Sequence, residues 1–286
     1  MFLSMRLFTG PFLLHTANRC QPFRCKVRST GSTAQYIGQP SSRDMEDEYS
    51  RQANEFIKSY LSNKQRSSVS IISKTDLLPH PMRYRRNGSD PLRDVVIADM
   101  FCDAKECRAL CSFLRGSALS HLMLSSGERK ADMSEDCLSL LGLSGPEIDL
   151  CAGIHHKMQC FAEKEFNRPL RQEGSIVSWL SCMDDRDGQD NRIESRFEDG
   201  NNNLYTYSNV HCDKANNCRY DISAILYLND GFEGGQLAFL DEHSDFLIEP
   251  SAGRAVLFHS CIRNIHQVRP VLSGHRLGIS VWFSVS

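Results

Sequence analysis

The N-terminal segment lacks acidic residues. No Asp or Glu precedes Asp44, whereas six Arg and Lys residues lie before it, and Ser and Thr are frequent. This composition is typical of a mitochondrial transit peptide, while the stretch LFTGPFLL also fits a poor secretory signal and a disordered basic tail is the third alternative. We therefore expect residues 1–43 to be a targeting or disordered segment, for mitochondria or for the endoplasmic reticulum and secretory route.

The chain also lacks any Cys-x-x-Cys pair, although it has 12 cysteines. A zinc knuckle or a thioredoxin motif is therefore not expected. Cys102, Cys107 and Cys111 fall within one predicted helix and its start, which favours a stripe of small buried thiols. Disulfide bonds between some of the cysteines are the alternative if the chain is secreted.

Long apolar runs and an excess of charge are absent too. No run is long enough to span a bilayer, so we expect no transmembrane span. The formal net charge is only -2, which argues against a nucleic-acid partner. The one basic cluster, Arg83-Tyr84-Arg85-Arg86, is predicted to be a solvated loop. A length of 286 residues fits one large domain, or one domain with an appendage.

Helical patterns dominate the first half of the chain. Charged residues with apolar ones at helical spacing predict a surface helix over 43–65, and prolines with turn residues predict a loop over 70–91. Val95–Ile97 resembles a short strand. Asp103 and Glu106 form a capping-box signature, so a helix should start near Ala104. A second amphipathic helix is predicted over 146–167, with His155 and His156 at its surface and edge.

The pattern changes from Ile176 onward. Six short segments rich in Val, Ile, Tyr and Phe are separated mostly by Gly, Asn and Asp clusters, which is typical of many short strands. A sandwich, a barrel or a jelly roll would accommodate them. We expect an α+β fold in which helices pack on one face of a sheet-built core. The predicted regions are 44–172, mainly helical and supporting, and 173–286, the core.

Two residues in NVHCD raise the question of a metal. His211 and Asp213 lie two apart, and in a strand they would point to the same face. A surface position is the common explanation for one such pair. Ferrous oxygenases, however, hold iron with two His and one carboxylate and leave other positions open. The third ligand would come from one of the downstream histidines, which are His243, His259, His266 and His275.

The C-terminal tail favours His266 as that third ligand. It lies ten residues before Arg276, which starts a strand. Arg pairs bidentately with carboxylates and keeps its charge, so it suits a cosubstrate with a distal carboxylate. A second His-x-Asp pair, His243 and Asp245, lies too close to His266 for the intervening strands of a jelly roll. His259 is the alternative third ligand, but its distance along the sequence from Arg276 does not suit the order of ligands and arginine considered above.

Four segments together resemble the 2-oxoglutarate- and iron-dependent oxygenases of the prolyl hydroxylase group. They are NVHCD, YDISAILYLNDGFEGGQLAFLD, PSAGRAVLF and IHQVRPVLSGHRLGISVWF. Within that group, they most resemble the leprecan-type prolyl 3-hydroxylases and their uncharacterised relatives. The resemblance covers residues 200–286 well and the preceding helices only loosely. It implies a double-stranded β-helix (jelly roll), Fe(II), 2-oxoglutarate and often ascorbate.

The resemblance also implies roles for individual residues. His211, Asp213 and His266 match the iron ligands, and Arg276 matches the residue that binds the distal carboxylate of 2-oxoglutarate. Tyr227 stands where relatives place a tyrosine against the same carboxylate, with a core aromatic as the alternative. Three further expectations concern neighbouring positions: Tyr207 in the core or lining the pocket, Cys212 pointing away from the iron, and turn or bulge roles for Gly234 and Gly235.

The expected activity is hydroxylation of an unactivated C–H bond, with succinate and CO2 as co-products. The resemblance favours a prolyl residue in a protein or peptide partner. A small-molecule substrate is one alternative, and a catalytically silent scaffold on the same fold is another. The long polar stretch from Met183 to Asn203 is either a mobile cover for the substrate or an idle surface insertion.

Overall fold

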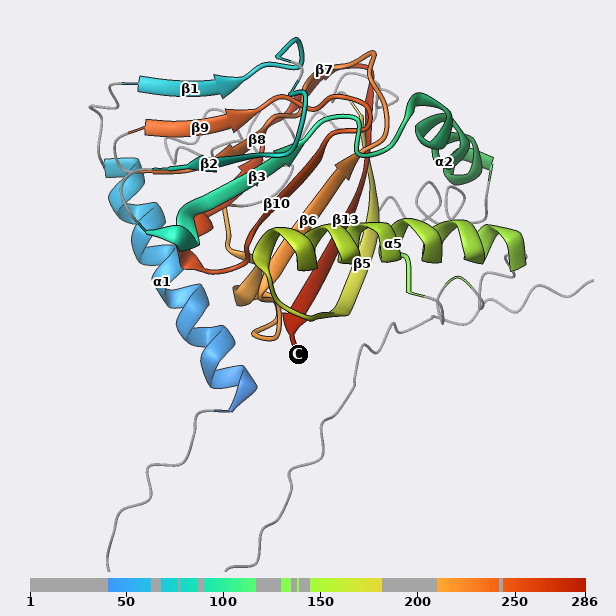
Figure 1. Cartoon of the computed structure of the whole chain (residues 1–286). Coiled ribbons are helices and arrows are strands. Elements are labelled where there is room, and N and C mark those ends of the chain that lie inside the picture. Colours follow the sequence, from blue (N-terminus) through green and yellow to red (C-terminus); the bar gives the residue numbers. More distant parts are fainter. Residues whose placement is uncertain are drawn as a thin grey trace, which may run out of the picture. The chain divides into compact units, whose positions relative to one another are not determined.

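Two β-sheets form the framework of the part of the chain that the structure describes. The computed structural model describes residues 41–62, 68–76, 78–86, 90–116, 130–134, 138, 145–181, 210–241 and 244–286. They belong to one unit, Pro40–Ser286 (Figure 1). The larger sheet has seven strands in the order β2 (Met82–Arg85), β3 (Asp94–Ala98), β10 (Ala255–His259), β6 (Ile222–Tyr227), β13 (His275–Val285), β5 (Leu170–Ser181) and β4 (Lys130–Asp132).

The smaller sheet has four strands. Its order is β1 (Ser68–Ile72), β9 (Ser244–Ile248), β8 (Leu237–Phe239) and β11 (His266–Val268), and a separate pair joins β12 (Val271–Ser273) to β7 (Glu233–Gly234). The pairings within the larger sheet are antiparallel, whereas β1 runs parallel to β9.

Apolar side chains from both sheets meet in one buried cluster. The larger sheet contributes Val95, Ile225 and Val256 among others, and the smaller sheet contributes Leu237 and Ile248. Burial of such side chains from water is the main favourable term in folding. Because two sheets face each other across this core, the predicted α+β fold with a double-stranded β-helix is confirmed.

The helices lie on two sides of this framework rather than on one. Helix α5 (Gly145–Phe166) crosses the outer face of the larger sheet over β5, β13 and β6 (Figure 1). Helix α1 (Ser42–Ser62) instead packs Ala53 and Tyr60 against Ala238 and Leu240, which come from β8 and its end. The prediction that the helices cover one face is therefore wrong for α1.

Helix α2 (Ala104–Gly116) begins as its sequence predicts. The Asp103 carboxylate accepts a hydrogen bond from the Glu106 amide at 2.8 Å, and the Glu106 carboxylate accepts one from the Asp103 amide at 2.9 Å. This reciprocal pair is the predicted capping box. Cys102, Cys107 and Cys111 are buried, as expected of a stripe of thiols facing the core.

Helix α5 differs from its prediction at one residue. His156 is exposed, but His155 is buried, and its Nε2 has no hydrogen-bond partner among the described residues. The two side chains point about 100° apart on the helix. That angle places one in solvent and the other in the protein, so the assignment of both to surface and edge is wrong for His155.

The segment 70–91 also differs from its prediction as a loop. It contains part of β1 and all of β2, which pair with β9 and β3. Within the basic cluster, Arg83 and Arg85 keep contact with solvent, but Arg86 is only 6% exposed. Strands β1 to β4 lie within the region predicted as mainly helical, so that region contributes strands to the same sheets as 173–286.

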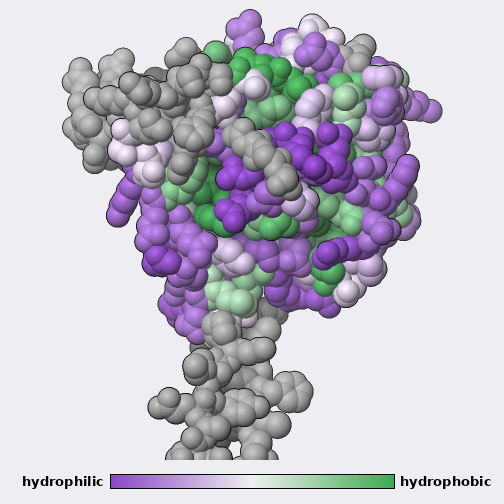
Figure 2. Space-filling view, turned by 60° about the vertical axis from the view of Figure 1, so that its left-hand side comes forward, coloured by the Kyte–Doolittle hydropathy of each residue, from purple (hydrophilic) through white to green (hydrophobic). Residues whose placement is uncertain are grey.

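The surface is mainly hydrophilic on the face shown in Figure 2, with separate hydrophobic patches. The most exposed apolar side chains include Val69 and Ile71 of the edge strand β1, at 57% and 52% exposed. Among the described residues, no helix is long and apolar enough to cross a membrane. The predicted targeting segment lies outside the described residues up to residue 40.

Candidate metal centre and cosubstrate pocket

Two histidines are brought together by a short antiparallel bridge. The His211 amide donates to the His266 carbonyl at 3.1 Å, and the His266 amide donates to the His211 carbonyl at 2.9 Å. The two ring centres lie 4.5 Å apart. The backbone bridge thus sets the spacing of the two imidazoles.

Asp213 completes the group from a short turn. It opens the 3-10 turn η3 (Asp213–Ala215), so the pair His211 and Asp213 does not lie on one continuous strand as predicted. The carboxylate nevertheless lies 3.4 Å from His211 Nε2 and 3.8 Å from His266 Nε2. The three potential ligand atoms all lie within 4.8 Å of one another.

The Asp213 carboxyl is held in its charged form. Burial by itself would raise its pKa, but His266, His211 and a hydrogen bond from Ser223 outweigh burial and keep the pKa well below its usual range. The Ser223 hydroxyl donates to Asp213 Oδ2 at 2.6 Å and also contacts the Ser260 hydroxyl at 2.7 Å. A buried carboxylate oriented in this way is ready to bind a cation.

His266 is held in its neutral form. Burial, together with neighbouring His211, lowers its pKa to about 4. Its Nδ1 lies 2.8 Å from the backbone carbonyl of Asn264. Since a carbonyl only accepts, Nδ1 carries the proton and Nε2 keeps a free lone pair toward Asp213. This is the tautomer that a metal ligand requires.

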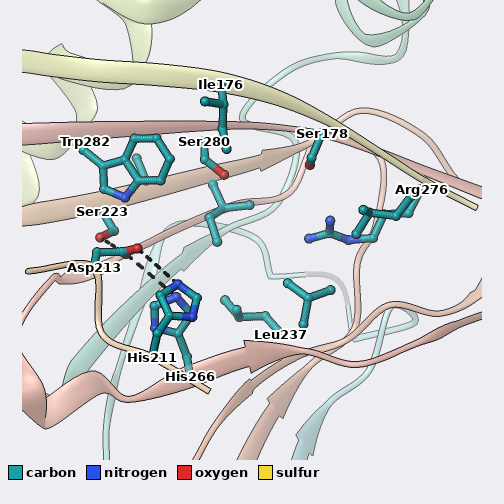
Figure 3. Close-up of a pocket in the computed structure, with 14 residues that line it drawn as sticks. Ile176, Ser178, His211, Asp213, Ser223, Leu237, His266, Arg276, Ser280 and Trp282 are labelled. Carbon is teal, nitrogen blue, oxygen red and sulfur yellow. Dashed lines mark hydrogen bonds and ion pairs between the residues drawn. The ribbon is translucent and has the colours of Figure 1, made fainter. Parts of the chain in front are cut away.

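One pocket joins this group to Arg276. In Figure 3 the two histidines and Asp213 stand at one end and Arg276 at the other, with Leu237 between them. Arg276 is 3% exposed, and its guanidinium carbon lies 4.9 Å from the centre of the Tyr227 ring. Arg276 Nε and Tyr227 Oη have no hydrogen-bond partner among the described residues. Burial raises the pKa of Tyr227, so its hydroxyl stays protonated as a donor.

A glycine makes room for the Arg276 side chain. A Cβ at Gly235 would lie 2.8 Å from Arg276 Cδ, and Gly235 has a φ of +66°. Gly234, the last residue of β7, also has a positive φ, and β7 pairs with β12 in an irregular register, so these glycines lie at a strand irregularity and not in a turn.

The residues present fit the two groups that the sequence predicts. Two imidazoles and one carboxylate form the donor set of non-haem Fe(II) oxygenases. A buried cation and a phenol, both with unsatisfied donors, fit the distal carboxylate of 2-oxoglutarate, since buried polar groups without partners are costly. Tyr227 also belongs to the buried apolar cluster, so both interpretations of it agree with its position.

The remaining candidate residues lie elsewhere. His259 packs its ring against Phe166, with 4.9 Å between ring centres, and His275 is exposed beside Trp179. Cys212 is buried in the cluster that packs against α1, which agrees with its predicted direction away from the metal. His243, Tyr207 and the stretch Met183–Asn203 lie outside the described residues.

Sequence reasoning missed two residues of the pocket that strand alternation would have found. Ser223 lies four residues before Tyr227 on β6, and Trp282 lies six residues after Arg276 on β13. In each strand the two residues are an even number of positions apart, so their side chains point to the same face of the strand. Asn264 and Ser260 carry no such signal, because they act from irregular segments.

Comparison with known proteins identifies this part of the chain. Residues 201–284 match the 2OG-Fe(II) oxygenase superfamily, where 2OG is 2-oxoglutarate. The chain contains a 2OG-Fe(II) oxygenase domain. The oxygenase domain is 38% identical over 81 residues to 2-oxoglutarate and iron-dependent oxygenase domain-containing protein 3 of Rattus norvegicus, covering 27% of this chain and 26% of that protein.

A second relative of the oxygenase domain is prolyl 3-hydroxylase 1 of Gallus gallus, 46% identical over 68 residues, which cover 23% of this chain and 9% of that protein. The aligned residues thus span about a quarter or less of these relatives. Among solved structures, the viral collagen prolyl hydroxylase of Paramecium Bursaria Chlorella virus-1 with 2OG is similar at 15% identity and a TM-score of 0.42, covering 67% of this chain and 96% of that one.

Proposed function

We propose that this chain is an Fe(II)- and 2OG-dependent dioxygenase that hydroxylates an unactivated C–H bond. One observation carries the proposal: the His211, Asp213 and His266 group and the unpaired donor of Arg276 open onto the same pocket. In the proposal, the first three residues hold the iron and Arg276 with Tyr227 holds the distal carboxylate of 2OG.

The bound groups supply the oxidation: 2OG, O2 and the substrate C–H bond give succinate, CO2 and the C–OH product. The chain's residues bind and orient. Ser223 fixes the Asp213 carboxylate, and the Asn264 carbonyl fixes the tautomer of His266. Arg276, at the opposite end of the pocket from the metal group, would fix the direction in which 2OG binds. Ascorbate is proposed as a reductant that keeps the iron ferrous.

A prolyl residue of a protein or peptide is the proposed substrate. Support comes from the relatives named prolyl 3-hydroxylases and from an aromatic wall at the metal end of the pocket. Trp282 lines the pocket and stacks on Tyr220, with ring centres 5.1 Å apart and planes 9° apart. The face of an indole carries negative potential, so it suits the polarised C–H groups of a pyrrolidine ring.

Succinate release and mass spectrometry test this proposal together. The purified chain is incubated with Fe(II), 2OG, ascorbate and Pro-rich peptides, and a gain of one oxygen on proline is expected. Trp282→Ala should raise the KM for peptide while leaving iron binding intact, and Trp282→Phe should restore most of the affinity. Succinate formed only with small molecules would reject the prolyl substrate, and no succinate under any condition would favour the silent scaffold.

A further inference from the structure

Arg86 is a buried cation whose hydrogen bonds go to neutral oxygen atoms. Its guanidinium donates to the carbonyls of Arg93 at 3.2 Å and Arg263 at 3.0 Å, and to Asn264 Oδ1 at 2.5 Å. Within the described ranges, no carboxylate lies within ion-pair distance of it. A buried charge that only neutral groups satisfy is expensive for a protein to keep. Arg86 also lies outside the residues that match the oxygenase superfamily.

The contacts of Arg86 lead directly to the metal group. Asn264 is fully buried, and its side-chain amide donates to the carbonyls of Leu92 and His259 at 2.7 and 2.8 Å. The same residue's backbone carbonyl accepts the Nδ1 proton of His266. Arg86 therefore completes the hydrogen bonding of the residue that orients a proposed iron ligand.

A second contact places the positive charge itself near the metal group. The guanidinium carbon of Arg86 lies 4.6 Å from the centre of the Phe239 ring. The Phe239 ring in turn lies 5.9 Å from the His266 ring, measured between ring centres. One aromatic ring thus contacts both a fixed cation and the proposed ligand. A charge in such low-dielectric surroundings acts over this distance with little screening.

We infer that Arg86 is a positioning residue for the metal centre, which holds Asn264 in place for His266 and whose fixed charge favours the ferrous over the ferric state. The inference rests on the proposed function. A nearby cation destabilises the more positive metal state, so it raises the Fe(III)/Fe(II) reduction potential. An iron that stays ferrous between turnovers needs less external reductant.

Two other charged residues, Arg93 and Asp241, lie near Arg86. Arg93 pairs with the Asp241 carboxylate, and that pair is roughly neutral as a unit. The net positive charge beside Phe239 therefore comes from Arg86. Removing the Asp241 carboxylate would add to it, and removing Arg86 would cancel it, so the two changes should move the potential in opposite directions.

The test measures the midpoint potential of iron bound to the full chain, by redox titration followed by electron paramagnetic resonance. Arg86→Met keeps an apolar side chain over Phe239 but removes the charge, and should favour the ferric state about tenfold, which is about 59 mV lower for one electron. Arg86→Lys should stay near the wild-type potential. Arg85→Met, which changes an exposed arginine one residue away, should have no effect.

Iron binding by the wild-type chain is measured first and separates the two proposals. A wild-type chain that binds no iron overturns the proposed function and this inference with it. If wild type binds iron and Arg86→Met keeps its potential, Arg86 is only a structural clamp and the inference alone is overturned. Where Arg86→Met does not fold, Asp241→Asn decides: a raised potential supports the inference, and an unchanged one overturns it.

Discussion

His211 and His266, far apart in the sequence, exchange two backbone hydrogen bonds and hold their rings 4.5 Å apart. The bridge is made by backbone groups, so it constrains the spacing of the two proposed iron ligands. Preorganisation of this kind reduces the conformational entropy that metal binding would otherwise cost.

Removing a proposed ligand should abolish iron binding without unfolding the chain. His211→Ala and Asp213→Ala each remove one of three donors, and we expect loss of stoichiometric Fe(II) and of succinate formation. Bound metal per chain and circular dichroism are the measurements. His259→Ala is the matched control, because His259 packs on Phe166 away from the group. Full activity in either ligand variant would show that the site is misassigned.

Arg276→Ala should raise the 2OG concentration needed for half-maximal turnover by more than tenfold. Truncating one partner of a buried charge-assisted pair costs about 2–5 kcal/mol. The KM for 2OG, measured by succinate release, should rise while Fe(II) binding is retained. Arg276→Lys keeps the charge but loses the planar fork, so an intermediate KM is expected. An unchanged KM for 2OG in the alanine variant would show that Arg276 does not bind the distal carboxylate of 2OG.

Gly235→Ala should weaken 2OG binding through Arg276. The new Cβ would lie 2.8 Å from Arg276 Cδ, and the backbone at Gly235 has a φ of +66°. Gly231→Ala is the control for backbone strain alone, since Gly231 has a φ of +84° but no atom within 4 Å of an added Cβ. Both variants should lose stability, as thermal denaturation measures, but only Gly235→Ala should raise the KM for 2OG. Equal values of KM would contradict the steric argument.

Acidification should destabilise the metal-free chain partly through His155. Burial lowers the pKa of His155 to about 4, against 6.5 in model compounds. The unfolded chain therefore takes up this proton more readily, so the contribution of His155 to stability is complete above about pH 6.5 and is lost as the pH falls toward 4. Between pH 7 and 5 the loss is about 2 kcal/mol.

Urea unfolding at pH 7 and pH 5 measures this loss. His155→Phe cannot take up the proton, so it should show a pH dependence smaller by that amount. The neighbouring exposed His156 provides the control variant His156→Phe, which should keep the wild-type dependence. Identical pH dependence in all three proteins would show that His155 titrates normally.

Tyr60→Phe should loosen the attachment of α1 to the smaller sheet. The Tyr60 hydroxyl is buried and donates to Asp245 Oδ2 at 2.6 Å. Loss of one hydrogen bond to a buried carboxylate should lower the free energy of unfolding by about 1–3 kcal/mol. Tyr84→Phe removes a hydroxyl that donates to the sulfur of Met82 at 3.9 Å, a weak acceptor, and should cost far less. Equal stability of the two variants would contradict the assignment.

The sequence by itself determined what depends on neighbouring residues. The capping box at Asp103 and Glu106 and the alternation along β13 are local, so the start of α2 and the inward position of Arg276 were predictable from spacing. The order along the chain of the His211 and Asp213 pair, then His266, then Arg276, was predictable as well. The spacing of a motif reflects the lengths of the strands in its fold.

Tertiary structure alone decided what depends on residues far apart in the chain. The parallel pairing of β1 with β9 and the packing of α1 on the smaller sheet have no local signal, since each needs a surface built by later residues. The basic cluster resembles any solvated loop, yet Arg86 becomes buried because three carbonyl oxygens, supplied by Arg93, Arg263 and the Asn264 side chain, converge on it. Burial of a charged residue is set by the partners that the fold brings to it, and those partners lie beyond the reach of any local pattern.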